Sequence, residues 1–365
     1  MLAILKRQDW ILTGAALFLV GSSLLILSSI QKELFWQQLI WVGFSAVAMA
    51  VCALIDWRPI FNYRWIVFGV YSFAVVLLLA TLLFAPTIRS AKSWLVVGPV
   101  QFQTSEFAKL ALILLLAYFF AKGHAGIARI GVLIKSFLYF VIPAALILKQ
   151  PDLGTGIIVF CIWMGFLLVS GIKWRHILIG VLILGALGAW GWSNFLKDYQ
   201  KERIIAFLNP SYSPLAVNYG VIQSKIAIGS AGFFGKGYGQ GTQVQLGFLP
   251  AASTDFIFAS FVEEWGGLGG TLILAAFTIL LVRLVVTGLR AQNNFSRLVC
   301  LGAVMMFLAQ FVINIGSTLG LLPVVGVTFP FFSYGGSSLL VNAMLIGIIQ
   351  SKVLRSSFLR DSDYA

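Results

Sequence analysis

The chain has 365 residues, of which 60% are hydrophobic and only 10% are charged. In a soluble globular domain, about a quarter of the residues are charged. The mean hydropathy of +0.97 also lies far on the apolar side. These values exclude an ordinary soluble protein and indicate an integral membrane protein. The net charge of +13 would suggest a nucleic-acid partner in a soluble protein, but membrane topology can produce the same excess.

A helix needs about 20 apolar residues to cross about 30 Å of hydrocarbon. The chain contains ten apolar runs of roughly this length, at 10–30, 36–55, 63–85, 105–122, 131–148, 154–171, 176–195, 266–289, 295–318 and 337–353. We therefore predict an all-α integral membrane protein with about ten transmembrane helices. No repeat or linker divides the chain, so we expect one membrane domain over residues 1–365.

The distribution of Lys and Arg predicts the topology of these helices. With the N-terminus in the cytoplasm, 15 of them fall at cytoplasmic ends and loops, and only four fall in the short outer loops. The positive-inside rule then places both termini in the cytoplasm. Residues 196–254, between the seventh and eighth helices, become a large extracytoplasmic loop. Because topology accounts for the basic excess, we expect no nucleic-acid partner.

Cysteine and histidine give little support to metal chemistry. Cys52, Cys161 and Cys300 lie far apart in apolar stretches, and the chain has no CxxC pair. Neither a disulfide framework nor a zinc site is supported. His124 and His176 border apolar runs, where we expect interfacial residues rather than ligands.

Acidic residues are rare in this chain, so those near membrane depth are candidates for function. Glu106 and Lys109 stand three residues apart at the outer end of the fourth helix, on one helix face, where they can form an ion pair. A structural ion pair and a role toward substrate are both open. Ser105 could also cap this helix.

Asp152 lies in the segment 150–155, which joins the fifth and sixth predicted helices. A proline followed by aspartate before an apolar run is typical of a turn that starts a helix. Asp152 is therefore either a helix cap or a buried carboxylate directed into a site.

The segment 196–265 is much longer than a connection between neighbouring helices requires, and long loops usually carry function. Its glycine-rich run, 235–243, is not a Walker A loop, because Gly237 and not Ser or Thr follows Lys236. It follows no strand either, so it is not a dinucleotide fingerprint. Its backbone amides could bind an anion with the help of Lys236; a flexible turn is the alternative.

Asp255 precedes an apolar, aromatic run. A carboxylate at the membrane boundary is partly desolvated, which makes it a better general base. The alternative is a helix N-cap formed by Thr254 or Asp255. Glu263 and Glu264 follow, and we expect at least one of them to pair with a cation.

These segments resemble the SEDS family (shape, elongation, division and sporulation) of bacterial cell-wall polymerases. The matching runs extend over about residues 92–340, in the order of the family and with its ten-span layout. They are 102–109, 150–155, Arg203 with 207–210, 223–230, 235–243, 254–259 with 263–264, 322–326 and 330–338.

The resemblance implies a peptidoglycan glycosyltransferase that joins lipid II units at the outer face of the bacterial cytoplasmic membrane, for cell elongation and rod shape. It implies an inverting displacement with Asp255 as the general base and undecaprenyl pyrophosphate as the leaving group. The implied residues of the substrate cavity are Glu106, Lys109, Asp152, Arg203, Lys225 and Lys236, of which the four cations are candidates to neutralise the pyrophosphate.

The resemblance also allows a divalent cation, Mg²⁺ or Mn²⁺, and requires no organic cofactor. The implied partners are a class B penicillin-binding protein with transpeptidase activity and other elongation-complex proteins. A lipid II flippase is the alternative function, and a scaffold protein is the third. A flippase needs polar residues through the midplane of the membrane, whereas Glu106, Asp152 and Asp255 are expected on one face.

Overall fold

The computed structural model describes residues 8–86, 92–97, 100–122, 130–172 and 218–362, together with isolated positions between 173 and 217. Seven helices in this part of the chain are long and apolar enough to cross a membrane, so the chain is a multi-pass membrane protein. They are α2 (Trp10–Ile30), α3 (Lys32–Leu54), α5 (Arg64–Phe84), α6 (Thr104–Lys122), α7 (Ile130–Lys149), α13 (Ile257–Arg290) and α14 (Asn294–Thr318).

The remaining described helices are shorter or only partly apolar. Helix α8 (Leu153–Val169) and the first part of α15 (Gly336–Ser362) are apolar but just below spanning length, and α4 (Trp57–Asn62) is a short connector. The predicted runs at 10–30, 63–85, 105–122, 131–148, 154–171 and 295–318 agree with these helices to within one or two residues at each end. The predicted run 176–195 lies outside the continuously described residues.

Helix α13 extends further toward the N-terminus than the predicted eighth span, 266–289. It begins at Ile257, and residues 257–264 are buried. Gly266 has φ 73° and ψ −176°, which is not helical. It therefore divides α13 into two helical parts, and the predicted span matches the second. In the first part, Glu263 and Glu264 are buried because polar side chains of neighbouring segments bond to both.

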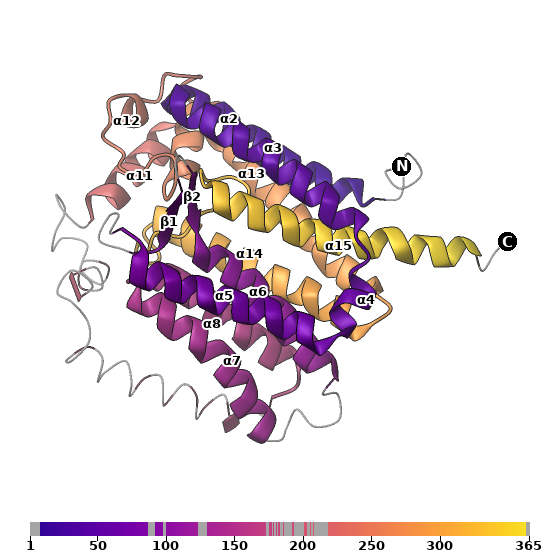
Figure 1. Ribbon diagram of the computed structural model, residues 1–365. Helices are drawn as coiled ribbons and strands as arrows, with labels where there is room; N and C mark the ends of the chain where they lie inside the picture. Colours follow the sequence, from indigo (N-terminus) through magenta and orange to yellow (C-terminus); the bar gives the residue numbers. More distant parts are fainter. Residues whose placement is uncertain are drawn as a thin grey trace.

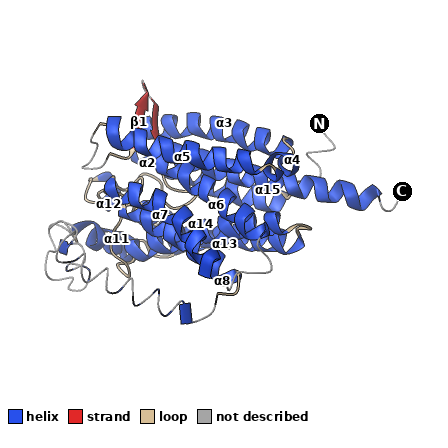
Figure 2. Cartoon of the chain, turned by 60° about the horizontal axis from the view of Figure 1, so that its bottom comes forward, coloured by secondary structure: helices blue, strands red, loops and turns tan. Residues whose placement is uncertain are grey.

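The described part of the predicted outer loop, from residue 218 onward, contains two helices, α11 (Tyr219–Ser230) and α12 (Thr242–Gln245). The expectation of an all-α fold is confirmed, with one short pair of strands added to the helices. Strands β1 (Trp94–Val97) and β2 (Val100–Gln103) form an antiparallel hairpin in which Trp94 faces Gln103. The β-branched valines favour this pairing, and the hairpin projects from the helices in Figure 2.

Helix α6 lies at the centre of the bundle and is buried along most of its length. It contacts α5, α7, α8, α14 and α15, while α13 packs between α2 and α14, and α15 runs along α3 (Figure 1). The contact of α14 with α6 is close because Gly302 faces Ile113.

The bundle has two distinct ends (Figure 1). At the first, which we call the terminal end, Asp9 caps α2 by accepting from the Leu12 amide and forms a 2.7 Å ion pair with Arg283 of α13. Gln350 of α15 exchanges hydrogen bonds with the Asp9 backbone. The second, which we call the loop end, carries α11, α12 and the hairpin.

Candidate active site

Asp255 lies at the loop end, in the turn that leads into α13. Its side chain is half-buried. The N-cap position of α13 is Phe256, which makes no side-chain cap hydrogen bond. Neither Thr254 nor Asp255 is therefore the N-cap residue of α13.

The backbone of Asp255 is held by two buried polar side chains of α14. Asn314 donates its amide to the carbonyl oxygen of Asp255 at 3.1 Å and to that of Val327 at 2.8 Å. The hydroxyl of Thr318 donates to the same Asp255 carbonyl at 3.3 Å. Neither residue was predicted from the sequence, although a carboxamide inside the apolar run 295–318 was a signal that could have indicated Asn314.

The segment 323–335 forms a wall beside Asp255. The Ser333 hydroxyl donates to the Thr254 carbonyl at 2.6 Å, and the Tyr334 amide donates to the Ser253 carbonyl at 2.9 Å. A Cβ added to Gly326 would lie 4.0 Å from Asp255 Oδ2. Because Gly326 has φ +73°, glycine suits this position, and residue 326 itself places no side chain against the carboxylate.

Glu106 and Lys109 form the ion pair that their spacing predicts. Lys109 Nζ donates to Glu106 Oε1 at 2.8 Å, and the two side chains are 0% and 5% exposed. Ser105 lies within α6 as its second residue rather than before it. A buried pair of this kind is held by mutual attraction, since either charge alone would be costly in this environment.

Asp152 is a helix cap, which was one of the two roles that the sequence left open, and it is only partly buried. Its Oδ1 caps α8 by accepting from the Thr155 amide at 3.0 Å. Its Oδ2 accepts from Gln103 Nε2 at 3.2 Å and from Ser105 Oγ at 3.4 Å. Asp152 therefore joins the start of α8 to the hairpin and to the start of α6.

The start of α8 also reaches the wall beside Asp255. A Cβ on Gly154 would lie 2.6 Å from the carbonyl oxygen of Val325 and 2.7 Å from a methyl group of Val327. This close approach requires glycine at 154. The helix that Asp152 caps thus packs directly against the residues on either side of Gly326.

The remaining predicted cations lie in different surroundings. Lys225 on α11 has an exposed side chain that lies over the turn at Gly320. Lys236 is 23% exposed and pairs with Glu263 at 2.7 Å, which confirms that one of the two adjacent glutamates has a cationic partner. Arg203 lies outside the described residues.

No group of three or more His, Cys, Asp or Glu converges among the described residues. Mg²⁺ can be held by one or two carboxylates together with substrate phosphates. The divalent cation expected from the resemblance therefore stays a prediction, and no step below depends on it.

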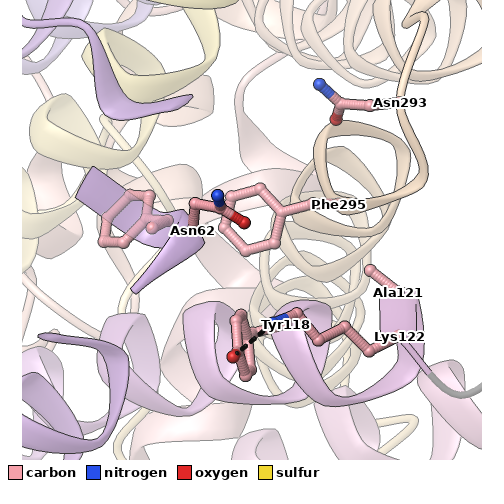
Figure 3. Close-up of a pocket in the computed structure, with 7 residues that line it drawn as sticks. Asn62, Tyr118, Ala121, Lys122, Asn293 and Phe295 are labelled. Carbon is pink, nitrogen blue, oxygen red and sulfur yellow. Dashed lines mark hydrogen bonds between the residues drawn. The ribbon is translucent and has the colours of Figure 1, made fainter. Parts of the chain in front are cut away.

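A pocket of about 250 Å³ lies at the terminal end, far along α6 and α14 from Asp255 (Figure 3). Lys122 closes one side, with its ammonium hydrogen-bonded to the Tyr118 hydroxyl at 2.7 Å. The other residues that line it are Phe61, Asn62, Ala121, Asn293 and Phe295. Among the described residues no carboxylate lines this pocket, so it offers no counterpart to the Asp255 side chain.

Fold and site together define a multi-pass membrane protein with a half-buried carboxylate at one end of the helical bundle, next to buried polar networks. The chain belongs to the FTSW_RODA_SPOVE family, described as cell cycle protein, whose model matches residues 5–357. The resemblance that the motifs suggested is thereby confirmed.

Individual relatives agree with this assignment. The chain is 38% identical over 310 residues to the peptidoglycan glycosyltransferase MrdB of Escherichia coli K12, covering 85% of this chain and 84% of that protein. It resembles a chain in a solved structure titled "Structural coordination of polymerization and crosslinking by a peptidoglycan synthase complex", with a TM-score of 0.82, 32% identity and coverage of 96% and 98%. The rod-shape-determining protein RodA of Thermus thermophilus matches with a TM-score of 0.71 and 29% identity, over 96% of this chain and 97% of that chain.

Proposed function

We propose that this chain is a peptidoglycan glycosyltransferase that polymerises lipid II at the outer face of the bacterial cytoplasmic membrane. The family assignment and the relatives named as peptidoglycan glycosyltransferases support this class of reaction. The observation that carries the chemistry is the half-buried Asp255 carboxylate, whose backbone is held by Asn314 and Thr318 and whose Oδ2 faces Gly326.

In the proposed reaction, Asp255 accepts the proton of the 4-hydroxyl group of a GlcNAc on one lipid-linked substrate. The hydroxyl oxygen attacks the anomeric carbon of the MurNAc on the other substrate and forms the new glycosidic bond. The bond from that carbon to the pyrophosphate oxygen breaks, and undecaprenyl pyrophosphate leaves with the electron pair. One displacement of an α-linked donor inverts the configuration and gives a β linkage.

The developing charge on the pyrophosphate requires cations. Lys109, Arg203, Lys225 and Lys236 remain the candidates. Of these candidates, the structure describes the three lysines. Lys225 is the most accessible of them, whereas Lys109 and Lys236 already have carboxylate partners. The grooves between the apolar helices would hold the polyprenyl chains. A class B penicillin-binding protein is the proposed partner, by analogy with the synthase complex that this fold matches.

The lipid II flippase is the weaker alternative. Glu106, Asp152 and Asp255 all lie at helix starts at the loop end, whereas a carrier that moves a polar head group needs polar residues across the midplane. A scaffold would need no half-buried carboxylate in the Asp255 turn.

The test uses the purified chain with its penicillin-binding partner and lipid II as the substrate. We expect glycan polymer from the wild type and a loss of about 10²-fold or more in Asp255→Asn, since a general base typically contributes 10²–10⁴-fold in rate. The melting temperature should change little, because Asn keeps the size of the side chain. Near-normal polymer from Asp255→Asn would end the assignment of the base, and a wild type that moves lipid II without polymerising it would favour the flippase.

A further inference from the structure

Glu263 is a fully buried carboxylate that the proposed reaction does not use. It lies on α13, eight residues after Asp255, and has 0% exposure. Taking a charged carboxylate out of water costs several kcal/mol unless it is paired and hydrogen-bonded. Its partners therefore indicate what the residue is for.

The side-chain partners of Glu263 all come from one short segment, 236–244. Lys236 Nζ donates to Oε1 at 2.7 Å, and the Thr242 hydroxyl donates to the same oxygen at 3.2 Å. The backbone amides of Gln243 and Val244 donate to Oε1 at 2.9 Å and to Oε2 at 3.3 Å. The carboxylate thus receives one ammonium, one hydroxyl and two amides that begin α12.

The sequence left open whether the backbone amides of the glycine-rich run 235–243 bind an anion, and these hydrogen bonds show which group they bind. The amides that open α12 could have bound an external anion, but the carboxylate of Glu263 already accepts from them. Gly241 makes room for it, because a Cβ there would lie 3.0 Å from Glu263 Oε2. The run is therefore built around an internal anion supplied by α13.

The same segment is also joined to α13 by its backbone. The Lys236 amide donates to the Glu263 carbonyl, and the Gly237 amide donates to the Glu264 carbonyl, both at 3.0 Å. Gly235 has φ +82°, and a Cβ there would overlap the Glu264 carbonyl oxygen. The segment thus follows the surface of α13 at the break at Gly266.

A buried apolar cluster connects α12 to the site. Val244 of α12 belongs to a cluster with Ala227, Leu249, Phe256 and Ala259. The Leu249 amide donates to the Gln243 carbonyl at 3.0 Å, so the loop that precedes Asp255 is also bonded to α12. Phe256 follows Asp255 directly in the chain. A shift of α12 would therefore disturb the packing of Phe256, the residue next to Asp255.

We propose that Glu263 is a positioning residue for the glycosyl transfer: by holding the start of α12, it fixes the buried cluster of Val244 and Phe256, and this cluster sets the place of the Asp255 carboxylate. This inference rests on the proposed function, in which Asp255 is the base. Glu263 does not touch the substrate in this scheme. Its removal should lower the rate of the chemical step more than the affinity for lipid II.

The chain offers a matched control in the neighbouring residue. Glu264 is equally buried, at 1% exposure. Its side chain accepts from Ser29, from Gln245 Nε2 at the end of α12 and from the backbone of Gly239, but not from the backbone amides that begin α12. Glu263→Gln and Glu264→Gln each remove one buried charge from adjacent positions of α13. Only the first places an amide group against the Gln243 and Val244 N–H donors.

The experiment measures glycan polymerisation against lipid II concentration for the full chain with its penicillin-binding partner. We expect kcat to fall about tenfold or more in Glu263→Gln with KM within about threefold, and both constants to stay within about threefold in Glu264→Gln. Hydrogen exchange at the amides of 243 and 244 should accelerate only in Glu263→Gln. A Glu263→Gln variant that keeps at least half of the wild-type kcat would overturn the proposal.

Val244→Ala tests the structural route from α12 to Asp255. This single variant also keeps the proposal testable if the Glu263→Gln chain does not fold. Val244→Ala leaves the carboxylate and its hydrogen bonds in place but reduces the packing of the buried cluster that contains Phe256, and we expect kcat to fall about threefold or more. The double variant, Glu263→Gln with Val244→Ala, should have a kcat within about twofold of that of the more damaging single variant. A normal kcat in Val244→Ala, or losses that multiply in the double variant, would refute the route.

Asp255→Asn, measured in parallel, separates the two proposals. If it polymerises normally, the proposed function has failed, whatever Glu263 does. If it is inactive while Glu263→Gln is fully active, only the positioning role has failed.

Discussion

The side chain of Asn314 is bonded to the backbone of Asp255, 59 positions earlier in the chain, by a 3.1 Å hydrogen bond. The same amide group donates to Val327 at 2.8 Å, so one buried carboxamide ties the Asp255 turn to the wall opposite it. The position of the proposed base is thus controlled from the end of α14.

Replacement of Asn314 should therefore reduce both stability and activity. Asn314→Leu leaves two buried carbonyl groups without this donor, at about 1–3 kcal/mol for each that stays unsatisfied. We expect a lower melting temperature and at least tenfold less glycan polymer. Asn314→Asp should be at least as damaging, because a carboxylate would face two carbonyl oxygens.

The control for Asn314 lies one helical turn earlier. Gln310 is 1% exposed, and neither of its amide atoms has a hydrogen-bond partner among the described residues. Gln310→Leu should keep or raise the melting temperature, since it removes a buried polar group that lacks a direct partner. A Gln310→Leu variant that loses as much stability as Asn314→Leu would show that volume rather than hydrogen bonding decides both results.

The two glycines at the break of α13 should respond differently to alanine. Gly266 has φ +73°, and a Cβ there would overlap the Phe233 carbonyl oxygen, whereas a Cβ on Gly267 would meet nothing closer than 3.7 Å. Gly266→Ala should lower the melting temperature strongly, because both the conformation and the space are unfavourable. Gly267→Ala should be tolerated or slightly stabilising. Equal melting temperatures for the two variants would contradict this account of the break.

The ion pair of Glu106 and Lys109 gives a charge-swap prediction. Glu106→Gln or Lys109→Met leaves one buried charge unpaired, which typically costs 3–5 kcal/mol. The swapped variant, Glu106→Lys with Lys109→Glu, should recover most of this loss. A small deficit should remain, because a cation in the first turn of α6 opposes the helix dipole by about 0.3–1 kcal/mol. If the swap melts no higher than the worse single variant, the pair does not contribute as described.

These residues also show which parts of the molecule the sequence could predict. The spacing of Glu106 and Lys109 was sufficient because both lie on one helix, where the geometry is local. Asp255 could be found because a carboxylate next to an apolar run is rare. Neither inference needed the tertiary structure.

Contacts between distant segments could not be predicted in this way. A cationic partner was expected for Glu263 or Glu264, but its identity could not be predicted, because Lys236 lies 27 positions from Glu263 in a loop without periodicity. The hold of Asn314 on Asp255 depends on how α14 packs against the Asp255 turn, which the hydrophobic pattern does not encode. The early start of α13 has the same origin, since loop partners allow its carboxylates to be buried.

The topology can be tested with an impermeant thiol reagent on intact cells. Leu246, beside α12, is 66% exposed, and Arg290 is exposed at the other end of α13. Leu246→Cys should be labelled from outside, whereas Arg290→Cys should be protected until the membrane is opened. The reverse pattern would place the loop end in the cytoplasm and contradict the proposed location of the site.

Asp152 supplies the last prediction, because its two oxygens do different things. Oδ1 caps α8, and Oδ2 accepts from Gln103 and Ser105. Asp152→Asn keeps the capping oxygen, and its new amide group can be accommodated if the Gln103 amide flips and the Ser105 hydroxyl rotates. We expect polymerisation to fall by less than about tenfold, far less than in Asp255→Asn.

Asp152→Ala removes the cap as well, which typically costs about 0.5–2 kcal/mol. The start of α8 would then be held less firmly against Val325 and Val327, on either side of Gly326. This variant should melt lower and polymerise less than Asp152→Asn. If Asp152→Asn instead abolishes polymer formation at an unchanged melting temperature, the negative charge of Asp152 takes part in the chemistry, and the role of base must be examined at both aspartates.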